Sequence, residues 1–378
     1  MSYIVLARKY RPKNFLELKG QEVLVQTLTN AITFNKLHHA YLLTGIRGIG
    51  KTTTARIIAK TVNCENLNKS ENAITPCEEC GNCRSIKNNS HPDVVEFDAA
   101  SNTGIDDVKA MFDGISYAPA LGKYRVFIVD EVHMLSTKAF NSLLKTLEEP
   151  PENVIFIFAT TEIQKVPITI LSRCQKFVLS ALSLDKMQEH LEFVCQKEEI
   201  IPEESVLKLI AMKAGGSVRD ALSILDQAIM QSSSKNIQAA VVKTMLSFVS
   251  QEEITQIFDS VLHCEIKTVL GILKTLKAKG LDEVAIMEEF LEHIYTKVSE
   301  NVFNEVDCGS LLRLWNIFLN SIGDLQLASN KYIALEMIFI KAVHVYSAPS
   351  LENIIHSIGD GKIAEIIKDF PNATIESI

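Results

Sequence analysis

The sequence predicts an α/β domain built on a parallel sheet, followed by two domains made of helices. In the first 180 residues, short apolar runs alternate with helix-like stretches. This alternation is typical of a parallel sheet covered by helices. After residue 180 the apolar residues recur at helical spacing and no strand is evident.

Five apolar runs are expected to form buried parallel strands, because each is short and rich in residues that suit a strand covered on both faces. They are Tyr41–Thr44, Val94–Phe97, Val126–Val129, Val154–Ala159 and Phe177–Leu179. Helices are expected between them over Thr52–Val62 and Thr137–Leu147. The second helix should stop before Pro150 and Pro151, since proline disfavours helical backbone in the residue before it.

Three amphipathic helices are expected next. They are Leu184–Ile200, Glu203–Lys213 and Val218–Met230. Gly215 and Gly216 interrupt the pattern before the third helix, and Ser217 is its expected N-cap. Helical patterns resume after Gln231–Asn236 and run to the end of the chain, so we place the domains at 1–180, 181–243 and 244–378.

Composition limits the functional classes. The chain has 378 residues, 47% of them hydrophobic, and a net charge of -8. This charge argues against a surface that is basic throughout, so any contact with DNA should be local. The sequence shows neither a signal peptide nor an apolar run of membrane-spanning length, and we therefore expect a cytoplasmic protein without membrane contact.

A glycine-rich loop follows the first expected strand and precedes a helix. It matches the P-loop pattern through Gly45, Ile46, Arg47, Gly48, Ile49, Gly50, Lys51 and Thr52. Backbone N–H groups in such a loop converge on phosphate oxygens of ATP. Lys51 is expected to reach the β and γ phosphates, Thr52 to place its hydroxyl on Mg²⁺, and Thr53 to join the nucleotide-binding set. A chance match is the alternative, and the strand–loop–helix context argues against it.

Asp130 and Glu131 come directly after the strand Val126–Val129. A P-loop protein needs a carboxylate there for the hydration shell of the metal, and we assign that role to Asp130. Glu131 is expected to polarise the attacking water. A solvated helix start is the alternative interpretation of an isolated acidic pair. His133 receives no catalytic role, because a lone histidine is more often structural.

Four of the eight cysteines form a cluster with two overlapping C-x-x-C steps and a more distant fourth member. They are Cys64, Cys77, Cys80 and Cys83. Because cysteines inside cells stay reduced and four thiolates suit tetrahedral zinc, we predict a structural zinc module over about 64–90. A redox-active C-x-x-C is the rival interpretation. The remaining cysteines are expected to be core or half-buried residues, namely Cys174, Cys195, Cys264 and Cys308.

In this order the motifs resemble those of the bacterial DNA polymerase III gamma/tau subunits, the clamp-loader ATPases within the AAA+ superfamily. The resemblance spans the chain and is carried further by Val5–Pro12, Gly20-Gln21, Asp130–Leu135, Leu144–Pro151, Ala159–Thr161 and Leu171–Cys174. It implies an AAA+ nucleotide-binding domain over 1–180, a small helical lid over 181–243 and a helical collar that joins subunits over 244–378. The opening segment, with Ala7 and Arg11, would lie over the adenine and ribose.

The resemblance also implies roles for single residues. Thr160 resembles the polar sensor between the γ phosphate and the acidic pair, with Thr161 as the alternative. Arg173 resembles the arginine finger, which reaches the ATP of the adjacent subunit. Arg219 resembles the second sensor, which contacts phosphate from the lid. A guanidinium would offset the charge on the transferring phosphoryl group, although either arginine alone could be a salt-bridged surface residue.

Two further features of the family concern contacts with other molecules. In the collar, one helix face suits packing either between subunits or within the domain, and the sequence does not separate these options. Its residues are Leu311, Leu312, Leu314, Trp315, Phe318 and Leu319. The segment Ala99–Gly104 opens a helix that faces the primer-template duplex in the family, with Lys109 as the only nearby basic side chain.

The implied function is that of an ATP-driven clamp-loader subunit with ATP, Mg²⁺ and structural Zn²⁺ as cofactors. Its partners would be delta, delta prime and further gamma/tau copies in a pentameric ring, the sliding clamp (beta) and primed DNA. The expected catalytic set is Lys51, Asp130, Glu131 and Arg173, and no polymerase active site is visible. Another loader-type or branch-migration AAA+ protein, a scaffold without hydrolysis and a small-molecule kinase are weaker alternatives. Binding of helicase or polymerase alpha, which belongs to a tail beyond the collar, is not expected.

Overall fold

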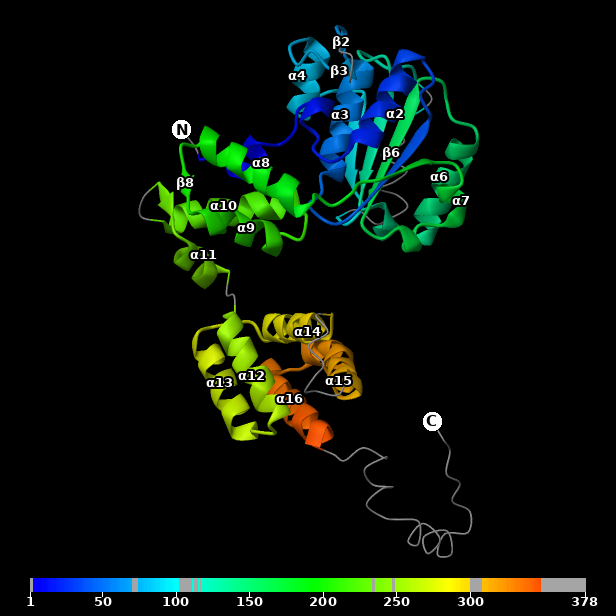
Figure 1. Cartoon of the computed structure of the whole chain (residues 1–378). Helices are drawn as coiled ribbons and strands as arrows, with labels where there is room; N and C mark the ends of the chain where they lie inside the picture. The colour runs from blue at the N-terminus through cyan, green and yellow to red at the C-terminus, as the bar shows by residue number, and fades with distance from the viewer. Residues whose placement is uncertain are drawn as a thin grey trace, which may run out of the picture. The chain divides into compact units, whose positions relative to one another are not determined.

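A computed structural model of the chain describes residues 3–69, 74–101, 111, 115, 117–232, 235–246, 249–299 and 308–347. The chain divides into two compact units, Met1–Lys243 and Thr244–Ile378 (Figure 1). This division lies at the predicted start of the collar. The predicted boundary at residue 180 falls inside the first unit and stays a prediction.

A five-stranded parallel sheet forms the centre of the first unit, in the order β4-β5-β6-β1-β7. The strands are β1 (Ala40–Thr44), β4 (Val94–Asp98), β5 (Arg125–Asp130), β6 (Val154–Thr160) and β7 (Gln175–Val178). The predicted parallel sheet is thereby confirmed, with small shifts at the strand ends. Because all five strands run the same way, their carboxyl ends meet at one edge of the sheet.

Helices cover both faces of this sheet (Figure 1). The layers are α2 (Glu22–Thr33) and α3 (Lys51–Asn63) on one face, and α6 (Thr137–Glu148) and α7 (Ile168–Leu171) on the other. Leu43 of β1 packs into the first layer and Leu42 into the second, because successive side chains of a strand point to opposite faces.

The three predicted helices after residue 180 are present as α8 (Leu184–Lys197), α9 (Glu204–Lys213) and α10 (Val218–Gln231). Ser217 caps α10 by accepting the N–H of Asp220. The prediction that no strand follows residue 180 is wrong, because β8 (Ile201–Pro202) pairs in parallel with β9 (Asn236–Ile237). Two residues are too few to produce a recognisable alternation.

The N-terminal segment is tied to these helices. Its short helix α1 (Leu6–Lys9) contacts α10. Asp226 of α10, which is 5% exposed, accepts the Tyr3 hydroxyl and, at 3.4 Å, the first N–H of α1. Glu198 at the end of α8 accepts the Tyr10 hydroxyl. The start of the chain is therefore fixed on α8 and α10 within the first unit.

Where the structure describes it, the second unit is built from helices, which confirms the predicted helical region. After α11 (Ala239–Met245) come α12 (Gln251–Leu262), α13 (Ile266–Ala278), α14 (Glu283–Ser299), α15 (Cys308–Leu327) and α16 (Lys331–Ser347). On α15, Leu311, Leu314 and Phe318 are buried in the core of the unit, whereas Leu312 and Leu319 are exposed. One part of this helix face therefore packs in the core of the unit, and the other part is exposed to solvent.

The four cysteines outside the cluster agree only in part with the prediction that they are core or half-buried residues. Cys195 is buried and Cys174 is half-buried, as expected. Cys264 is exposed instead, because it lies in the turn between α12 and α13 with a left-handed φ of 59°. The side chain of Cys308 lies outside the described residues.

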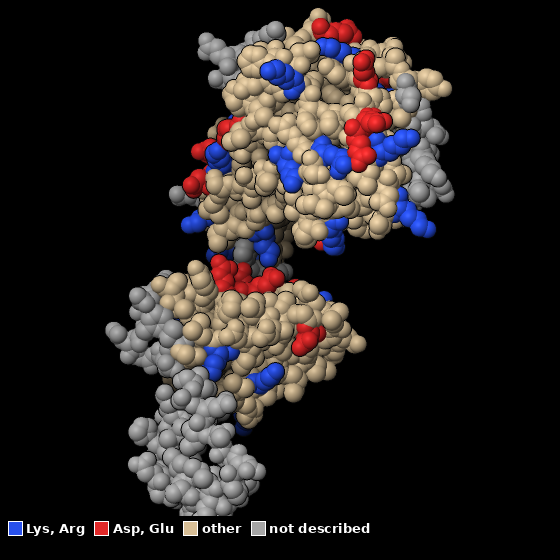
Figure 2. All heavy atoms as spheres, turned by 90° about the vertical axis from the view of Figure 1, so that its right-hand side faces the viewer, with Lys and Arg blue, Asp and Glu red and all other residues tan. Residues whose placement is uncertain are grey.

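The distribution of charged side chains on the surface is relevant to contact with nucleic acid. On the face drawn in Figure 2, Lys and Arg side chains are interspersed with Asp and Glu rather than gathered in one patch. The residues Asn102–Gly104 and Lys109, which the resemblance linked to duplex DNA, lie outside the described part of the chain. Within that part, every helix is too short or too polar to cross a membrane.

Candidate functional site

The glycine-rich loop joins β1 to α3 at the carboxyl edge of the sheet. Gly50 precedes α3 with a φ of 105°, which residues with a Cβ rarely adopt. Gly48 has a φ of 77°, and a Cβ there would lie 2.1 Å from Ser217 Oγ. The Arg219 N–H donates to the Gly48 carbonyl at 3.3 Å. The loop therefore packs its backbone directly on the start of α10.

Lys51 opens α3 and turns its side chain back into the loop. Its Nζ donates to the carbonyls of Gly45 at 3.0 Å and Ile46 at 3.1 Å, and the residue is 5% exposed. Burial lowers the pKa of Lys51, although Glu131 and Asp130 raise it. An ammonium held by neutral carbonyls can exchange them for phosphate oxygens of opposite charge.

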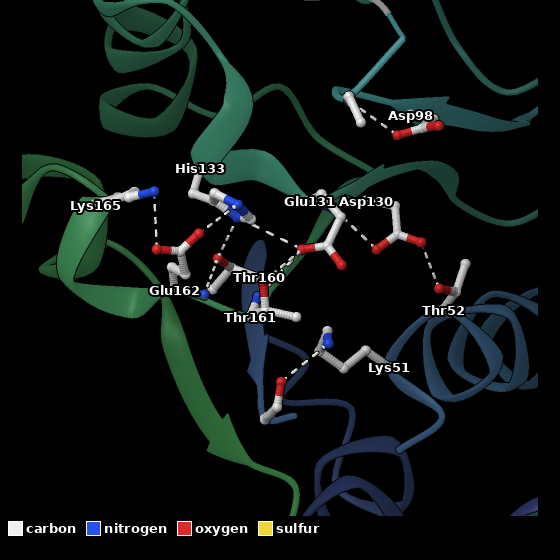
Figure 3. A network of polar contacts seen from close by, with 12 residues as sticks. Lys51, Thr52, Asp98, Asp130, Glu131, His133, Thr160, Thr161, Glu162 and Lys165 are labelled. Atoms are coloured by element: carbon white, nitrogen blue, oxygen red, sulfur yellow. Dashed lines mark hydrogen bonds and ion pairs between the residues drawn. The ribbon is translucent and has the colours of Figure 1, made fainter. Parts of the chain in front are cut away.

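The acidic pair lies opposite the loop, at the end of β5 (Figure 3). Thr52 donates its hydroxyl to Asp130 Oδ2, so the two predicted metal-binding residues are in contact. A hydroxyl and a carboxylate are the hard oxygen ligands that Mg²⁺ prefers. Glu131 has φ 46° and ψ 48°, a left-handed conformation that costs a non-glycine residue about 1–3 kcal/mol. This turn directs the Glu131 side chain towards the end of β6.

The two adjacent threonines at that end have different partners. Thr161 donates both its N–H and its hydroxyl to Glu131 Oε2, each at 3.2 Å. Thr160 is fully buried, and its Oγ1 contacts His133 Nδ1 at 2.9 Å and accepts the Glu162 N–H at 3.0 Å. Thr161 therefore contacts Glu131 directly. Thr160 contacts His133, which in turn lies near Glu131.

His133 is a site residue that the sequence reasoning set aside. It lies on the short helix η2 (Val132–Met134), with a side chain that is 6% exposed. Its Nδ1 is 3.5 Å from Glu131 Oε2 and its Nε2 is 3.2 Å from Glu162 Oε1. The one signal in the sequence was its place two residues after Glu131.

Two pockets meet at the glycine-rich loop, and they share Gly48, Gly50, Thr53 and Arg219. The first is otherwise lined mainly by Ala7, Tyr10, Arg11, Ile49, His190 and Leu222. The second is otherwise lined mainly by Arg47, Lys51, Thr52, Asp130, Glu131 and Thr161. The predicted binding residues Ala7 and Arg11 are thus brought to the loop, and Arg219 is brought to both the loop and the pocket of the acidic pair.

The electrostatics of the first pocket favour an anionic ligand. Burial lowers the pKa of Arg11, and the neighbouring cations Arg56 and Arg219 lower it further. A bound phosphate would stabilise the charged form of Arg11, because its negative charge offsets the mutual repulsion of the arginines. This partly apolar pocket with its arginines lies beside the pocket that holds Lys51 and the acidic pair, an arrangement that suits a nucleoside triphosphate with a bound cation.

Arg173 lines neither pocket. It follows α7, and its Nη2 lies 2.7 Å from Glu148 Oε1 while Nη1 donates to the Thr169 carbonyl at 2.7 Å. Its side chain is 32% exposed. The structure therefore does not bring Arg173 together with the other predicted catalytic residues of its own chain.

The cysteine module follows α3 and contains β2 (Asn68–Lys69), β3 (Ile74–Thr75) and α4 (Gly81–Lys87). The Sγ atoms of the four predicted ligands all lie within 4.8 Å of one another, close to the separation of about 3.8 Å that tetrahedral Zn–S bonds require. The N–H groups of Cys80 and Glu79 lower the pKa of Cys77 to about 7, which favours its thiolate. The residues present fit a zinc ion.

Protein-family models match consecutive parts of the chain. A model described as "DNA polymerase III, delta subunit" matches residues 20–183. One described as "DNA polymerase III clamp loader subunit, ATPase lid domain" matches 186–234. A third, "DNA polymerase III subunits gamma and tau domain III", matches 237–307 and 296–358.

Similar proteins are known from several bacteria. The DNA polymerase III subunit gamma of Buchnera aphidicola (subsp. Acyrthosiphon pisum) is 36% identical over 363 residues, covering 91% of this chain and 99% of the relative. The subunit tau of Escherichia coli is 43% identical over 291 residues, covering 77% of this chain and 44% of the relative. The chain thus spans about half the length, or less, of several curated relatives that it matches. Among solved structures, the RuvB Holliday junction branch migration motor of Thermotoga maritima is 19% identical, with 72% of this chain and 86% of that chain covered and a TM-score of 0.47.

Proposed function

Because the chain belongs to the family of DNA polymerase III gamma and tau subunits, we propose that it is an ATP-driven clamp-loader subunit. It binds and hydrolyses ATP to open a sliding clamp and load it onto primed DNA during DNA replication. The observation that carries the proposal is the meeting of the two pockets at Gly48, Gly50, Thr53 and Arg219, which joins the loop, the acidic pair and α10 around one space.

Hydrolysis at this site transfers the γ-phosphoryl group from ATP to water, with ADP as the leaving group. The water oxygen bonds to the γ phosphorus as the bridging P–O bond breaks, and that electron pair stays with ADP. Glu131 takes the proton of the water; since its Oε2 binds Thr161, we assign Oε1 to the water. Lys51 binds the β and γ oxygens. Mg²⁺, when bound by Thr52 and Asp130, offsets phosphate charge.

The sequence left two candidates for the polar sensor, Thr160 and Thr161. The direct contacts of Thr161 with Glu131 support Thr161, since a sensor has to stand between the γ phosphate and the acidic pair. Thr160 then serves as the buried support behind it, through its contacts with His133 and Glu162.

We assign Arg173 as the arginine finger for the ATP of a neighbouring subunit, which is supported by its absence from the lining of both pockets of its own chain. The test uses loaders in which only one chain has an intact Lys51. Arg173→Ala in that same chain should leave its turnover unchanged, whereas Arg173→Ala in the adjacent chain should reduce turnover about a thousandfold. Loss of turnover in the first arrangement would show that the arginine acts on its own ATP.

The proposed assembly is a pentameric ring with delta, delta prime and further gamma/tau copies. The helical second unit forms its collar, and the exposed Leu312 and Leu319 on α15 support a subunit contact there. The four clustered cysteines hold a structural Zn²⁺. The four Sγ atoms lie close enough together to bind one ion. Four protein ligands are typical of a structural zinc site, which has no open ligand position.

The function is tested by measuring ATP turnover of the reconstituted loader with and without clamp and primed DNA. Turnover should rise when both are added, and clamp should be retained on circular primed DNA. Glu131→Gln should keep ATP binding and lower turnover about a hundredfold or more. If ATP turns over but clamp and primed DNA do not change the rate, the clamp-loading role is wrong while the ATPase assignment stands.

A further inference from the structure

We propose that His133 is a positioning residue for hydrolysis, which orients Glu131 towards the attacking water by leaving one of its carboxylate oxygens to Thr161. The inference rests on the proposed ATPase function and deepens it. The imidazole lies between the end of β5 and the end of β6, surrounded by Glu131, Thr160 and Glu162 (Figure 3). Both ring nitrogens therefore contact groups that border the site.

We assign the ring hydrogen of His133 from its hydrogen-bond partners. Thr160 Oγ1 accepts the Glu162 N–H at 3.0 Å, so its own hydroxyl can donate to His133 Nδ1 at 2.9 Å. His133 Nε2 lies 3.2 Å from Glu162 Oε1, and an ionised carboxylate only accepts. The assigned tautomer therefore carries its hydrogen on Nε2 and accepts at Nδ1.

This tautomer directs the Glu131 carboxylate. Nδ1 lies 3.5 Å from Glu131 Oε2, which is too long for a strong hydrogen bond. An accepting nitrogen at that distance repels a carboxylate oxygen instead of binding it. Oε2 is therefore left to Thr161, whose N–H and hydroxyl both donate to it at 3.2 Å.

The ring is itself held firmly. Glu162 is fixed on its other side by Lys165 at 2.8 Å, at the end of the short helix η3 (Ile163–Lys165). The His133 side chain is 6% exposed, so bulk water cannot take over its contacts. Because Glu131 has a left-handed backbone, the direction of its side chain depends on such neighbours.

The first experiment separates turnover from binding. His133→Ala should lower kcat of the reconstituted loader about tenfold and change the Kd for ATP less than about twofold, because the phosphate-binding loop is untouched. His133→Asn, which restores an acceptor near the position of Nδ1, should recover most of the rate. His133→Gln, which restores a donor near Nε2, should recover less. His39→Ala, at the residue before β1 and therefore at the opposite edge of the sheet from the acidic pair, is the control and should leave kcat unchanged.

The second experiment asks whether the effect passes through Glu131. In a Glu131→Gln loader, adding His133→Ala should lower the residual rate less than about twofold, because the group being positioned is already gone. A full tenfold loss in both backgrounds would overturn the proposal, as would an unchanged kcat or an equal loss of kcat and ATP affinity. If His133→Ala does not fold, the Asn and Gln variants decide by the same criteria. An inactive wild-type loader would instead count against the proposed function itself.

Discussion

Replacing Lys51 by methionine should remove ATP binding and leave the fold at least as stable. Lys51 is 5% exposed, and its ammonium donates to two neutral carbonyls. The lowered pKa of Lys51, caused first by burial, reflects the cost of keeping this charge out of water. Methionine has a similar length and no charge, so we expect the free energy of unfolding without nucleotide to rise by about 1 kcal/mol.

ATP should stabilise the wild-type protein against unfolding, and the Lys51→Met variant should lose this stabilisation. At an ATP concentration of about 100 times Kd, binding stabilises the wild-type protein by about 2.7 kcal/mol. For a unit of this size each kcal/mol raises Tm by about 2–4 °C, so the wild-type shift should be roughly 5–10 °C. Lys51→Met should show a shift of about 1 °C or less at the same ATP concentration, since the ammonium that binds the phosphates is missing.

The assay is thermal and urea unfolding with and without Mg²⁺-ATP, with Lys60→Met as the control. Lys60 lies on the same helix and is 7% exposed, but its Nζ donates to the Lys13 carbonyl at 2.8 Å and lies 3.4 Å from Glu78 Oε1. Lys60→Met should lower stability and keep the ATP shift. A lower free energy of unfolding in Lys51→Met than in the wild-type protein without ATP, or a preserved ATP shift, would refute the reasoning.

Two other predictions concern the support of the site. Asp93 accepts the N–H groups of residues 120–122, which together outweigh the effect of burial and lower its pKa. Its stabilisation is therefore present above the unfolded pKa of about 4 and is lost as pH falls through the lower folded pKa. Asp93→Asn should flatten the pH dependence of the unfolding free energy below about pH 4, measured by urea unfolding; an unchanged slope would contradict this. Cys77→Ser should remove the single bound zinc in metal analysis and lower Tm, whereas Cys264→Ser, at an exposed cysteine, should do neither; retained zinc in Cys77→Ser would exclude the four-thiolate site.

Much of the fold could be predicted because its signals are local. The apolar runs of the sheet strands, the glycine-rich loop and the acidic pair are each recognisable within a few residues. Thr160 and Thr161 could not be separated in this way, because neighbouring residues at a strand end point in opposite directions. Which of them meets Glu131 depends on the left-handed turn at Glu131 itself.

Other parts of the site depend on contacts between distant segments. In the sequence His133 is a lone histidine, because its partners Thr160 and Glu162 come from the end of β6 and the turn after it. The pairing of β8 with β9 joins strands of two residues each, which carry no periodic pattern.

The bond between Tyr3 and Asp226 has a consequence for the order of events on the ribosome. The two residues are 223 positions apart, and at bacterial or slower elongation rates this stretch takes roughly 10 to 45 s to synthesise. A nascent chain that has reached residue 180 already contains the glycine-rich loop and the acidic pair, but the segment around Ala7 still lacks the helix that it rests on. The pocket around Ala7 is therefore still incomplete when the sheet first forms, and it closes only after α10 emerges.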